Sequence, residues 1–334
     1  MMWFQIFHND DQPRAPFPAA EAVRRLALVL NQRQSLCEKQ KKKKAMTSKI
    51  AVAQLTSTAD VARNTARCLA LIAQAAAGRA QCVFLPEASD YIAEHGKDES
   101  IALAQPLNGS FVTAVRAAAR EHAVWVSVGV HEKPAQQDDD DGKDMRFFNT
   151  HLLIDTQGQI ARSYRKVHLF DVSIANGPQL RESDAVRAGS DLGGAPAATP
   201  FGRVGLQICY DLRFPEQARH QRALGADVLT YPSAFTVPTG RAHWEILLRA
   251  RAIENQAYVV AAAQVGLHNP RRESYGHALV VDPWGAVIAH CTSQDDEIAF
   301  ADLDAALIAK TRAEMPVFSH RRLDLYPQPS SDIL

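Results

Sequence analysis

The sequence lacks any long hydrophobic run and any net charge. No stretch of about 18 consecutive apolar residues occurs in the 334-residue chain, and a helix that crosses a bilayer needs about that many. The 37 basic residues balance the 37 acidic ones, whereas proteins that bind nucleic acid or membrane surfaces normally carry a basic excess. We therefore expect no transmembrane helix, no nucleic-acid partner and no membrane partner.

Cysteine is scarce and scattered. The chain holds five cysteines, an odd number, and no two of them are spaced as CxxC. Disulfide scaffolds and zinc cages need paired or clustered cysteines. We therefore expect a protein of a reducing compartment, with the cytoplasm as the default, and no metal or cofactor.

The balanced total charge hides an uneven distribution. Residues 1–49 hold ten of the basic side chains and only four of the acidic ones, so the remainder carries a net charge of −6. We expect residues 1–46 to be a basic leader without fixed structure, residues 47–326 to form a single domain and residues 327–334 to be a tail. The leader has no secretory hydrophobic segment, but its short amphipathic stretch, residues 24–30, leaves a mitochondrial form open.

Short apolar runs alternate with helical periodicity beyond residue 49. A strand over 50–54, a helix over 60–77 and a strand over 82–85 are typical of a crossover unit. Three more helix–strand pairs are expected, over 109–122 and 124–129, over 215–224 and 227–231, and over 241–256 and 258–263. In the last helix, Ile246, Leu247, Ala250 and Ile253 share one face. Turn residues predict hairpins over 149–164 and 278–290. The pattern indicates an α/β fold with mixed sheets.

Three reactive side chains follow predicted strands: Glu87, Lys166 and Cys209. The carboxyl ends of strands are where α/β proteins bind ligands. Taken singly, each residue has an ordinary explanation. A glutamate after a strand is more often a helix cap or a solvated charge, a lysine is usually on the surface, and a cysteine is often a small core residue.

Cys209 has the most distinctive surroundings of the three. It closes the apolar strand over 204–208, and a helix begins within a few residues at Pro215. This placement predicts a sulfur exposed above the sheet, near helix-end amides that favour the thiolate. A core position explains Cys68 and Cys82 well, but it explains Cys209 less well because polar residues follow it at once.

In this order and with these flanking residues, the three side chains resemble the Glu–Lys–Cys triad of the nitrilase superfamily of carbon–nitrogen hydrolases. The resemblance covers residues 49–326 and rests on the motifs LPEA (85–88), YRKVHL (164–169) and GLQICYDLRFPE (205–216). It implies a four-layer α-β-β-α sandwich and amide hydrolysis through a thioester on Cys209. Glu87 would be the general base and acid, and Lys166 would stabilise the oxyanion. Glu182 matches a second glutamate of the family that orients substrate.

Several other stretches are similar to the branch of the superfamily that hydrolyses deaminated glutathione to 2-oxoglutarate and cysteinylglycine, a metabolite-repair reaction. They are residues 231–235, 242–245, 248–254, 259–264, 274–277, 281–285 and 320–326. The sister group, the ω-amidases, hydrolyses 2-oxoglutaramate to 2-oxoglutarate and ammonia; it shares the triad and remains the alternative.

Both small-molecule amide substrates carry carboxylates, so the pocket needs positive charge or hydrogen-bond donors. The candidate arginines, which the sequence does not rank, are Arg213, Arg249, Arg251 and Arg272. Tyr210, Phe235 and His243 are further expected substrate-binding residues. The resemblance also implies a homodimer that pairs through the helix over 241–256 and the segment over 311–326.

Other classes fit the sequence less well. A papain-like thiol protease would need its own cysteine signature, which is absent around Cys209. An α/β-hydrolase would show G-x-S-x-G, and nucleotide-binding folds would show one of two glycine patterns, none of which occurs. A catalytically silent binding protein on the same fold is also an alternative, although it would have no need of all three triad residues.

Overall fold

The structure, a computed structural model, describes residues 47–135, 144–173, 179–322 and 324–325. Residues 47–334 form one compact unit, separate from residues 1–46. The predicted leader, most of the predicted tail and the acidic run over 138–141 therefore lie outside the described residues. Within the described ranges, no helix combines the length and the hydrophobicity needed to cross a membrane.

The first sheet is mixed and has nine strands in the described part of the chain. Its order is β14-β13-β1-β2-β3-β4-β5, with β17 also paired to β1 and β8 to β4. β1 runs parallel to β2 and β13, and β2 runs parallel to β3, whereas β4 and β5 continue antiparallel. The strands are β1 Thr47–Leu55, β2 Cys82–Phe84, β3 Trp125–Glu132, β4 Phe147–Ile154, β5 Ile160–Arg165, β8 Val186–Arg187, β13 Ala263–Asn269, β14 Arg272–Tyr275 and β17 Ile298–Asp304.

The second sheet has the order β16-β15-β12-β11-β10-β9, and its central strands β10, β11 and β12 are parallel. These strands are β9 Ala197–Thr199, β10 Gly202–Leu206, β11 Val228–Thr230, β12 Tyr258–Ala261, β15 Leu279–Val281 and β16 Val287–His290. A separate hairpin joins β6 Asp171–Ser173 to β7 Gln179–Arg181. The mixed sheets predicted from the sequence are confirmed.

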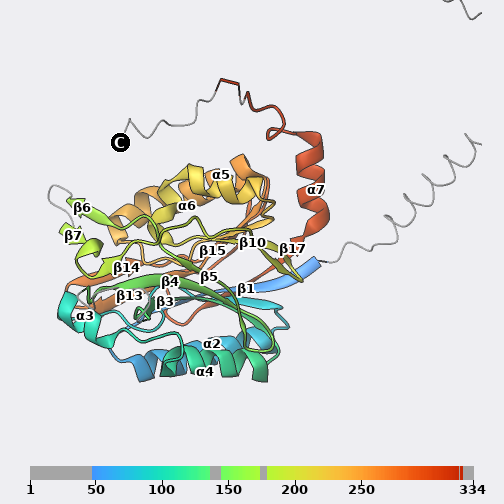
Figure 1. Ribbon diagram of the computed structural model, residues 1–334. Coiled ribbons are helices and arrows are strands. Elements are labelled where there is room, and N and C mark those ends of the chain that lie inside the picture. Colours follow the sequence, from blue (N-terminus) through green and yellow to red (C-terminus); the bar gives the residue numbers. More distant parts are fainter. Residues whose placement is uncertain (1–46, 136–143, 174–178, 323, 326–334) are drawn as a thin grey trace, which may run out of the picture. The chain divides into compact units, whose positions relative to one another are not determined.

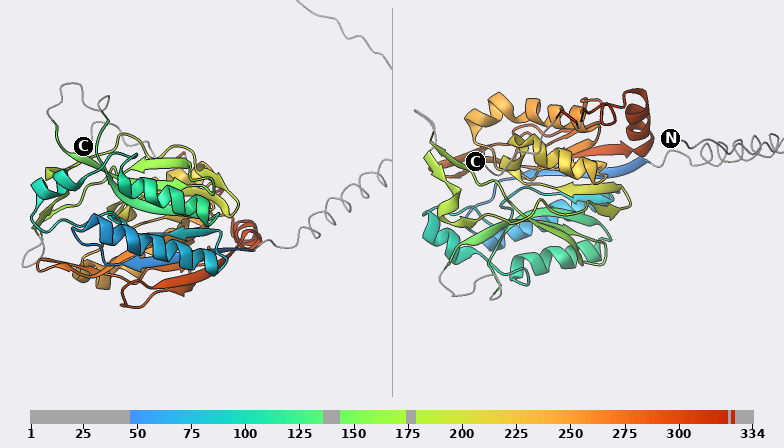
Figure 2. Two further views of the ribbon diagram at one scale, coloured as in Figure 1. Left: turned by 90° about the horizontal axis from the view of Figure 1, so that it is seen from below. Right: turned by 45° about the horizontal axis from the view of Figure 1, so that its top comes forward.

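Helices cover the outer face of each sheet (Figure 1). α2 and α4 lie side by side on the first sheet (Figure 2), and α5 and α6 cover the second. The helices are α2 Val61–Ala77, α3 Lys97–Leu103, α4 Ser110–Glu121, α5 Pro215–Ala223, α6 Val237–Asn255 and α7 Ala305–Glu314. The layers therefore follow the expected order α-β-β-α. The β6–β7 hairpin and α3 lie at one end of this sandwich and α7 at the other.

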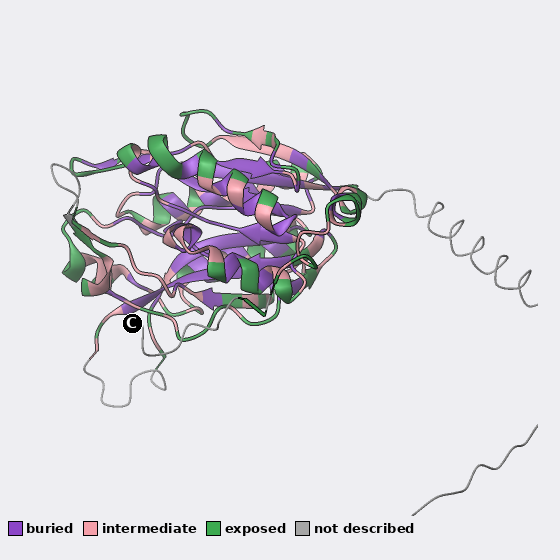
Figure 3. Cartoon of the chain, turned by 90° about the horizontal axis from the view of Figure 1, so that it is seen from above, coloured by how far each residue is buried: buried purple, intermediate pink, exposed green. Residues whose placement is uncertain are grey.

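Two apolar cores explain why the strands are hydrophobic on both faces. Side chains alternate across a strand, so Ile50 and Val52 of β1 enter the core between the two sheets. Ala51, Ala53 and Leu55 enter the second core, beneath α2 and α4. Figure 3 shows the buried strands inside and the exposed outer faces of the helices. A strand buried on both sides reads as a continuous apolar run, as observed.

The apolar face expected for the helix over 241–256 is not the buried face of α6. Ile246 and Ile253 are 70% and 51% exposed. The buried face instead carries Trp244, Leu248 and Ala252, and the Trp244 indole N–H donates to the His277 carbonyl at 2.8 Å. The difference arises because the row that contains Trp244 and Leu248 packs on the second sheet, while the isoleucines point away from it.

Candidate active site

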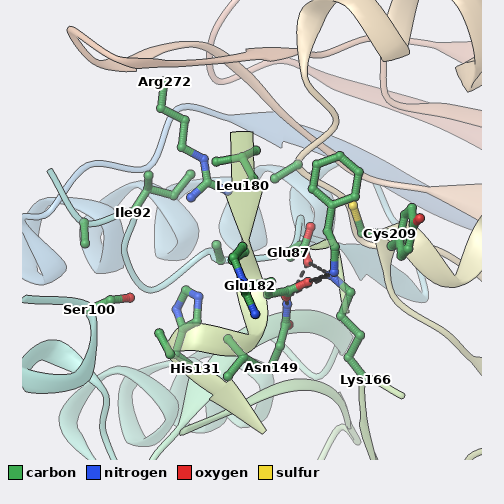
Figure 4. A pocket seen from close by; sticks show the side chains of 18 of the residues that line it. Glu87, Ile92, Ser100, His131, Asn149, Lys166, Leu180, Glu182, Cys209 and Arg272 are labelled. Carbon is green, nitrogen blue, oxygen red and sulfur yellow. Dashed lines mark hydrogen bonds and ion pairs between the residues drawn. The ribbon is translucent and has the colours of Figure 1, made fainter. Parts of the chain in front are cut away.

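Glu87, Lys166 and Cys209 meet at one end of the sandwich, although 79 and 43 residues separate them along the chain. Glu87 follows β2 and Lys166 follows β5, both in the first sheet, whereas Cys209 follows β10 in the second. All three line a cavity of about 280 Å³, shown in Figure 4. The site therefore exists only when the two sheets are packed together.

Lys166 lies at the centre of a buried charge cluster. Its Nζ is 3.0 Å from Glu87 Oε1 and 2.9 Å from each carboxylate oxygen of Glu182, as the dashed lines in Figure 4 show. Lys166 is only 2% exposed. Removing charges from water costs several kcal/mol per ion, so a cluster of this kind adds little net stability. Its presence points to a functional use of the charges.

Asn149 joins the two glutamates and was not singled out from the sequence. Its Nδ2 donates to Glu87 Oε1 at 2.7 Å and to Glu182 Oε1 at 3.1 Å. Glu182 Oε2 also accepts the Phe170 backbone N–H at 2.6 Å. The available signal was the polar run Asn149, Thr150 and His151 inside the predicted strand, because buried polar groups need partners.

The loop that carries Glu87 is held tightly against β3. A Cβ atom on Gly129 would lie 2.6 Å from Glu87 Cα, so only glycine permits this approach. On the other side, the Gln264 side-chain amide donates to the carbonyls of Glu87 and Ala88 at 2.9 and 3.1 Å. Ala88 has a positive φ of 55°, a conformation that costs free energy and is common at functional sites.

The turn that carries Cys209 is also strained and braced. Cys209 has a positive φ of 43° and begins a 3₁₀ turn, Cys209–Arg213, ahead of α5. The buried Asp211 carboxylate fixes this turn. It accepts the Ile208 backbone N–H at 2.9 Å and the Tyr164 hydroxyl at 2.8 Å, and it lies 2.7 Å from His168 Nδ1. The nucleophile turn is thus tied to the segment that carries Lys166.

The electrostatics of the site favour an ionised glutamate beside a neutral thiol. Burial opposes the charged form of Glu87, but the Lys166 charge and hydrogen bonds from Cys209 and Asn149 outweigh it and lower the pKa of Glu87. Burial likewise opposes the charge of Lys166, but Glu182 and Glu87 raise the pKa of Lys166 well above its usual value. Burial and the Glu87 charge raise the pKa of the Cys209 thiol.

One sequence expectation for Cys209 is wrong. The sulfur is not exposed above the sheet, since Cys209 is only 9% exposed. A backbone hydrogen bond at Ala234 lowers the pKa of the thiol, but burial and the Glu87 charge outweigh it, and the net effect is a raised pKa. The physical reason is that the two packed sheets bury the sulfur. The Glu87 carboxylate also lies beside it and opposes a second negative charge.

Only two of the four candidate arginines, Arg213 and Arg272, line the cavity. Arg251 is buried and donates to the Leu212 carbonyl and to Glu254, while Arg249 binds the Gly285 carbonyl and Glu245. Neither of these two lines the cavity.

The other expected substrate-binding residues lie close to Arg213. Tyr210 and Phe235 line the cavity, and the Arg213 guanidinium lies 5.8 and 5.5 Å from their ring centres. His243 does not line the cavity; its Nδ1 lies 3.3 Å from both Nη atoms of Arg213 and accepts from them in the neutral tautomer. His131, not singled out from the sequence, lines the opposite wall and is held by Asp90.

Nothing in the described residues resembles a metal centre, since no group of three or more histidine, cysteine or acidic side chains is placed to hold an ion. The cluster instead combines a thiol, a carboxylate that can take its proton and a fixed ammonium group. On a four-layer α-β-β-α sandwich, this combination is typical of hydrolases with a cysteine nucleophile. The carbon–nitrogen hydrolase family model matches residues 49–313, and the chain belongs to that family.

Relatives of known name match most of the domain. The chain is 46% identical to the nitrilase and fragile histidine triad fusion protein NitFhit of Drosophila melanogaster, over 85% of this chain and 60% of that protein. It is 46% identical to the deaminated glutathione amidase of Mus musculus, over 83% of this chain and 84% of that protein. The crystal structure of C. elegans NitFhit superposes with a TM-score of 0.78 at 47% identity, over 84% of this chain and 66% of that one. The chain thus spans about three fifths of the length of the fusion protein from Drosophila.

Proposed function

We propose that this protein hydrolyses the amide bond of deaminated glutathione, releasing 2-oxoglutarate and cysteinylglycine. One observation carries the proposal: the Lys166 ammonium group bridges Glu87 and Glu182 at 2.9–3.0 Å, beside the Cys209 thiol and inside the cavity. The similarity to the mouse deaminated glutathione amidase supports this choice of substrate. The protein would then act in metabolite repair.

In the first half-reaction, Cys209 is acylated. The ionised Glu87 takes the thiol proton as the sulfur attacks the amide carbon. Negative charge moves to the carbonyl oxygen, where Lys166 and the backbone amide that follows the nucleophile stabilise it. When the tetrahedral intermediate collapses, the carbon–nitrogen bond breaks, Glu87 gives its proton to the amine nitrogen, and cysteinylglycine leaves.

In the second half-reaction, water replaces the thiol. Glu87, ionised again, takes a proton from water, and the hydroxide attacks the thioester carbon. The carbon–sulfur bond breaks, 2-oxoglutarate leaves, and the proton returns from Glu87 to the sulfur. Glu182 keeps Lys166 in place throughout, because it holds the ammonium group through both oxygens.

Arg213 would bind the carboxylate of the 2-oxo acid. It follows the nucleophile by four residues, and its partners are two aromatic rings and the His243 imidazole, with no carboxylate among them. Its charge is therefore available to a substrate anion, and a guanidinium group binds a carboxylate through two parallel hydrogen bonds. Tyr210, Phe235 and His243 would shape this end of the pocket.

The test is release of 2-oxoglutarate from deaminated glutathione and, separately, from 2-oxoglutaramate, with Cys209→Ala as the control. We expect a higher kcat/KM for deaminated glutathione and no turnover by the variant. A preference for 2-oxoglutaramate would replace this proposal with an ω-amidase. Unchanged turnover by Cys209→Ala would rule out the mechanism, and turnover of neither amide would favour a silent binding protein or another amide.

We also propose that the protein is a homodimer of the cytoplasm, with a mitochondrial form directed by the leader. The exposed α6 patch (Ile246 and Ile253 of α6 with Trp284, which is 60% exposed) supports the dimer, because exposed apolar side chains that lie together mark protein–protein contacts more often than single ones do. Fractionation of cells that express the full chain with a C-terminal tag tests the two compartments. A signal in neither would reject the assignment.

A further inference from the structure

Three basic side chains that line the cavity, Lys97, Arg213 and Arg272, have no acidic partner among the described residues. Arg213 stands beside the nucleophile turn, whereas Arg272 enters from β14, on the far side of the cavity from Cys209 (Figure 4). In the residues that the structure describes, the Arg272 guanidinium has no hydrogen bond and no ion pair with another side chain. By comparison, Arg181, which also lines the cavity, pairs with Asp184 at 3.7 Å.

In the described part of the chain, the only acidic side chains that line the cavity are Glu87 and Glu182, and both are bound by Lys166. Ile92 and Leu180 lie beside Arg272, and Ser100 and His131 complete this side of the cavity (Figure 4). Leu180 is 41% exposed. Arg272 is itself exposed. An exposed guanidinium group without an acidic partner is suited to bind a carboxylate.

The backbone that carries Arg272 is fixed. Asn269 pairs with Arg272 at the end of the β13–β14 hairpin, and its Nδ2 donates to the Ala93 carbonyl at 3.2 Å. The buried His268 lies 2.8 Å from both the Ser57 carbonyl and Ser274 Oγ. Arg271, in contrast, turns away and donates to the Glu94 carbonyl. The hairpin therefore presents Arg272, and not its neighbour, to the cavity.

We propose that Arg272 is the residue that makes the site specific for an amide whose leaving amine ends in a carboxylate. The inference rests on the proposed function and deepens it. With the acyl carbonyl at Cys209 and the 2-oxo carboxylate on Arg213, the leaving dipeptide extends across the cavity toward β14. Two extended residues span roughly 7 Å, so their terminal carboxylate lies well beyond the scissile bond on the side of the cavity that holds Arg272. 2-Oxoglutaramate has no such group and does not reach Arg272.

The experiment compares three substrates: deaminated glutathione, its analogue with an amidated glycine terminus, and 2-oxoglutaramate. For the wild type we expect KM for the amidated analogue to be about tenfold higher than for deaminated glutathione, since one charge-assisted pair is lost. Arg272→Gln should raise KM for deaminated glutathione by a similar factor, abolish the difference between the two peptides, and leave 2-oxoglutaramate turnover unchanged. Arg272→Lys should restore part of the difference.

The control variant is Arg271→Gln, which removes the neighbouring charge but not the cavity residue and should keep the wild-type preference. An equal loss on all three substrates in Arg272→Gln would show a structural role and overturn the inference, as would a preserved peptide preference. If the wild type hydrolyses 2-oxoglutaramate but not deaminated glutathione, the proposed function fails, and the inference fails with it. If the wild type hydrolyses deaminated glutathione but Arg272→Gln keeps the peptide preference, only the inference fails.

Discussion

At the scale of single residues, the site is a balance of three charges and a thiol. Glu87 raises the pKa of Cys209, and Lys166 opposes it. The thiol therefore stays protonated in the resting enzyme, and the base beside it stays ionised because its own pKa is lowered. Such a pair keeps the nucleophile unreactive toward oxidants and alkylating agents until a substrate carbonyl is in reach.

This balance predicts opposite effects of one substitution on turnover and on alkylation. Glu87→Gln removes the base and should reduce kcat by about 10²–10⁴-fold. The same change removes the charge that raises the pKa of Cys209 while Lys166 remains, so the thiolate should form at lower pH. The measurement is the rate of iodoacetamide labelling of Cys209 between pH 6 and pH 9, followed by peptide mass spectrometry.

In Glu87→Gln the labelling profile should shift to lower pH relative to the wild type, and Cys209→Ala is the control for labelling at other cysteines. The other described cysteines, Cys68, Cys82 and Cys291, are buried and free, so they should label only on unfolding. A profile that shifts to higher pH in Glu87→Gln would contradict the charge balance described above.

At the scale of elements, the site depends on close contact between β3 and the loop that carries Glu87, which a glycine permits. Gly129 of β3 leaves no room for a side chain beside Glu87, because the atoms that a Cβ would meet belong to the Glu87 and Pro86 backbone. Backbone atoms cannot rotate away as a flexible side chain can. A substitution here must move the whole loop that carries the general base.

Gly129→Ala should therefore lower kcat by roughly a hundredfold, since a displacement of about 1 Å has effects of that order. The substitution should lower Tm by only a few degrees, because β3 remains paired to β2 and β4. Activity and thermal unfolding measured on the same preparation separate the two effects. Full activity, or a loss of activity explained entirely by unfolding at the assay temperature, would contradict this account of the loop.

Most helices and strands of the fold could be predicted from the sequence, but two helices could not. The crossover strands and helices, and the hairpin over 149–164, are predicted within a few residues because buried strands and amphipathic helices leave strong periodic patterns. α3 and α7 were not predicted. α3 has no buried residue, and α7 buries only Ile308 and Thr311, so neither carries a clear apolar stripe.

The candidate site was predicted only in part, because sequence patterns locate strand ends but not the packing of the two sheets. Glu87, Lys166 and Cys209 each follow a strand, so a position at the carboxyl end of a sheet could be expected for each of them, but their meeting across two sheets could not. The choice of Arg213 and Arg272 over Arg249 and Arg251 could not be predicted, because an arginine in a helix, a turn or a strand can equally reach a pocket or the surface. Their access to the cavity depends on how the two sheets pack and on where the β13–β14 hairpin folds back. Local sequence patterns predict neither of these.

At the scale of the whole molecule, the α6 patch predicts the assembly. Ile246 and Ile253 do not pack in the core of their own chain, so their replacement should disturb the interface but not the fold. We expect the double variant Ile246→Glu/Ile253→Glu to be monomeric by light scattering, with an unchanged circular dichroism spectrum. Ala117→Glu, which is exposed on α4 on the other sheet, serves as the control. A wild-type species of only 36.7 kDa would refute the dimer.

The central claim concerns the two sheets together: the first supplies Glu87 and Lys166, the second supplies Cys209, and amide hydrolysis passes through a thioester on that sulfur. The most direct measurement is rapid quenching of the enzyme with deaminated glutathione, followed by intact-mass and peptide-mass analysis. The account predicts a 2-oxoglutaryl adduct on Cys209 that forms and decays at the rate of turnover. Steady turnover with no adduct on Cys209, or with the adduct on another residue, would contradict it.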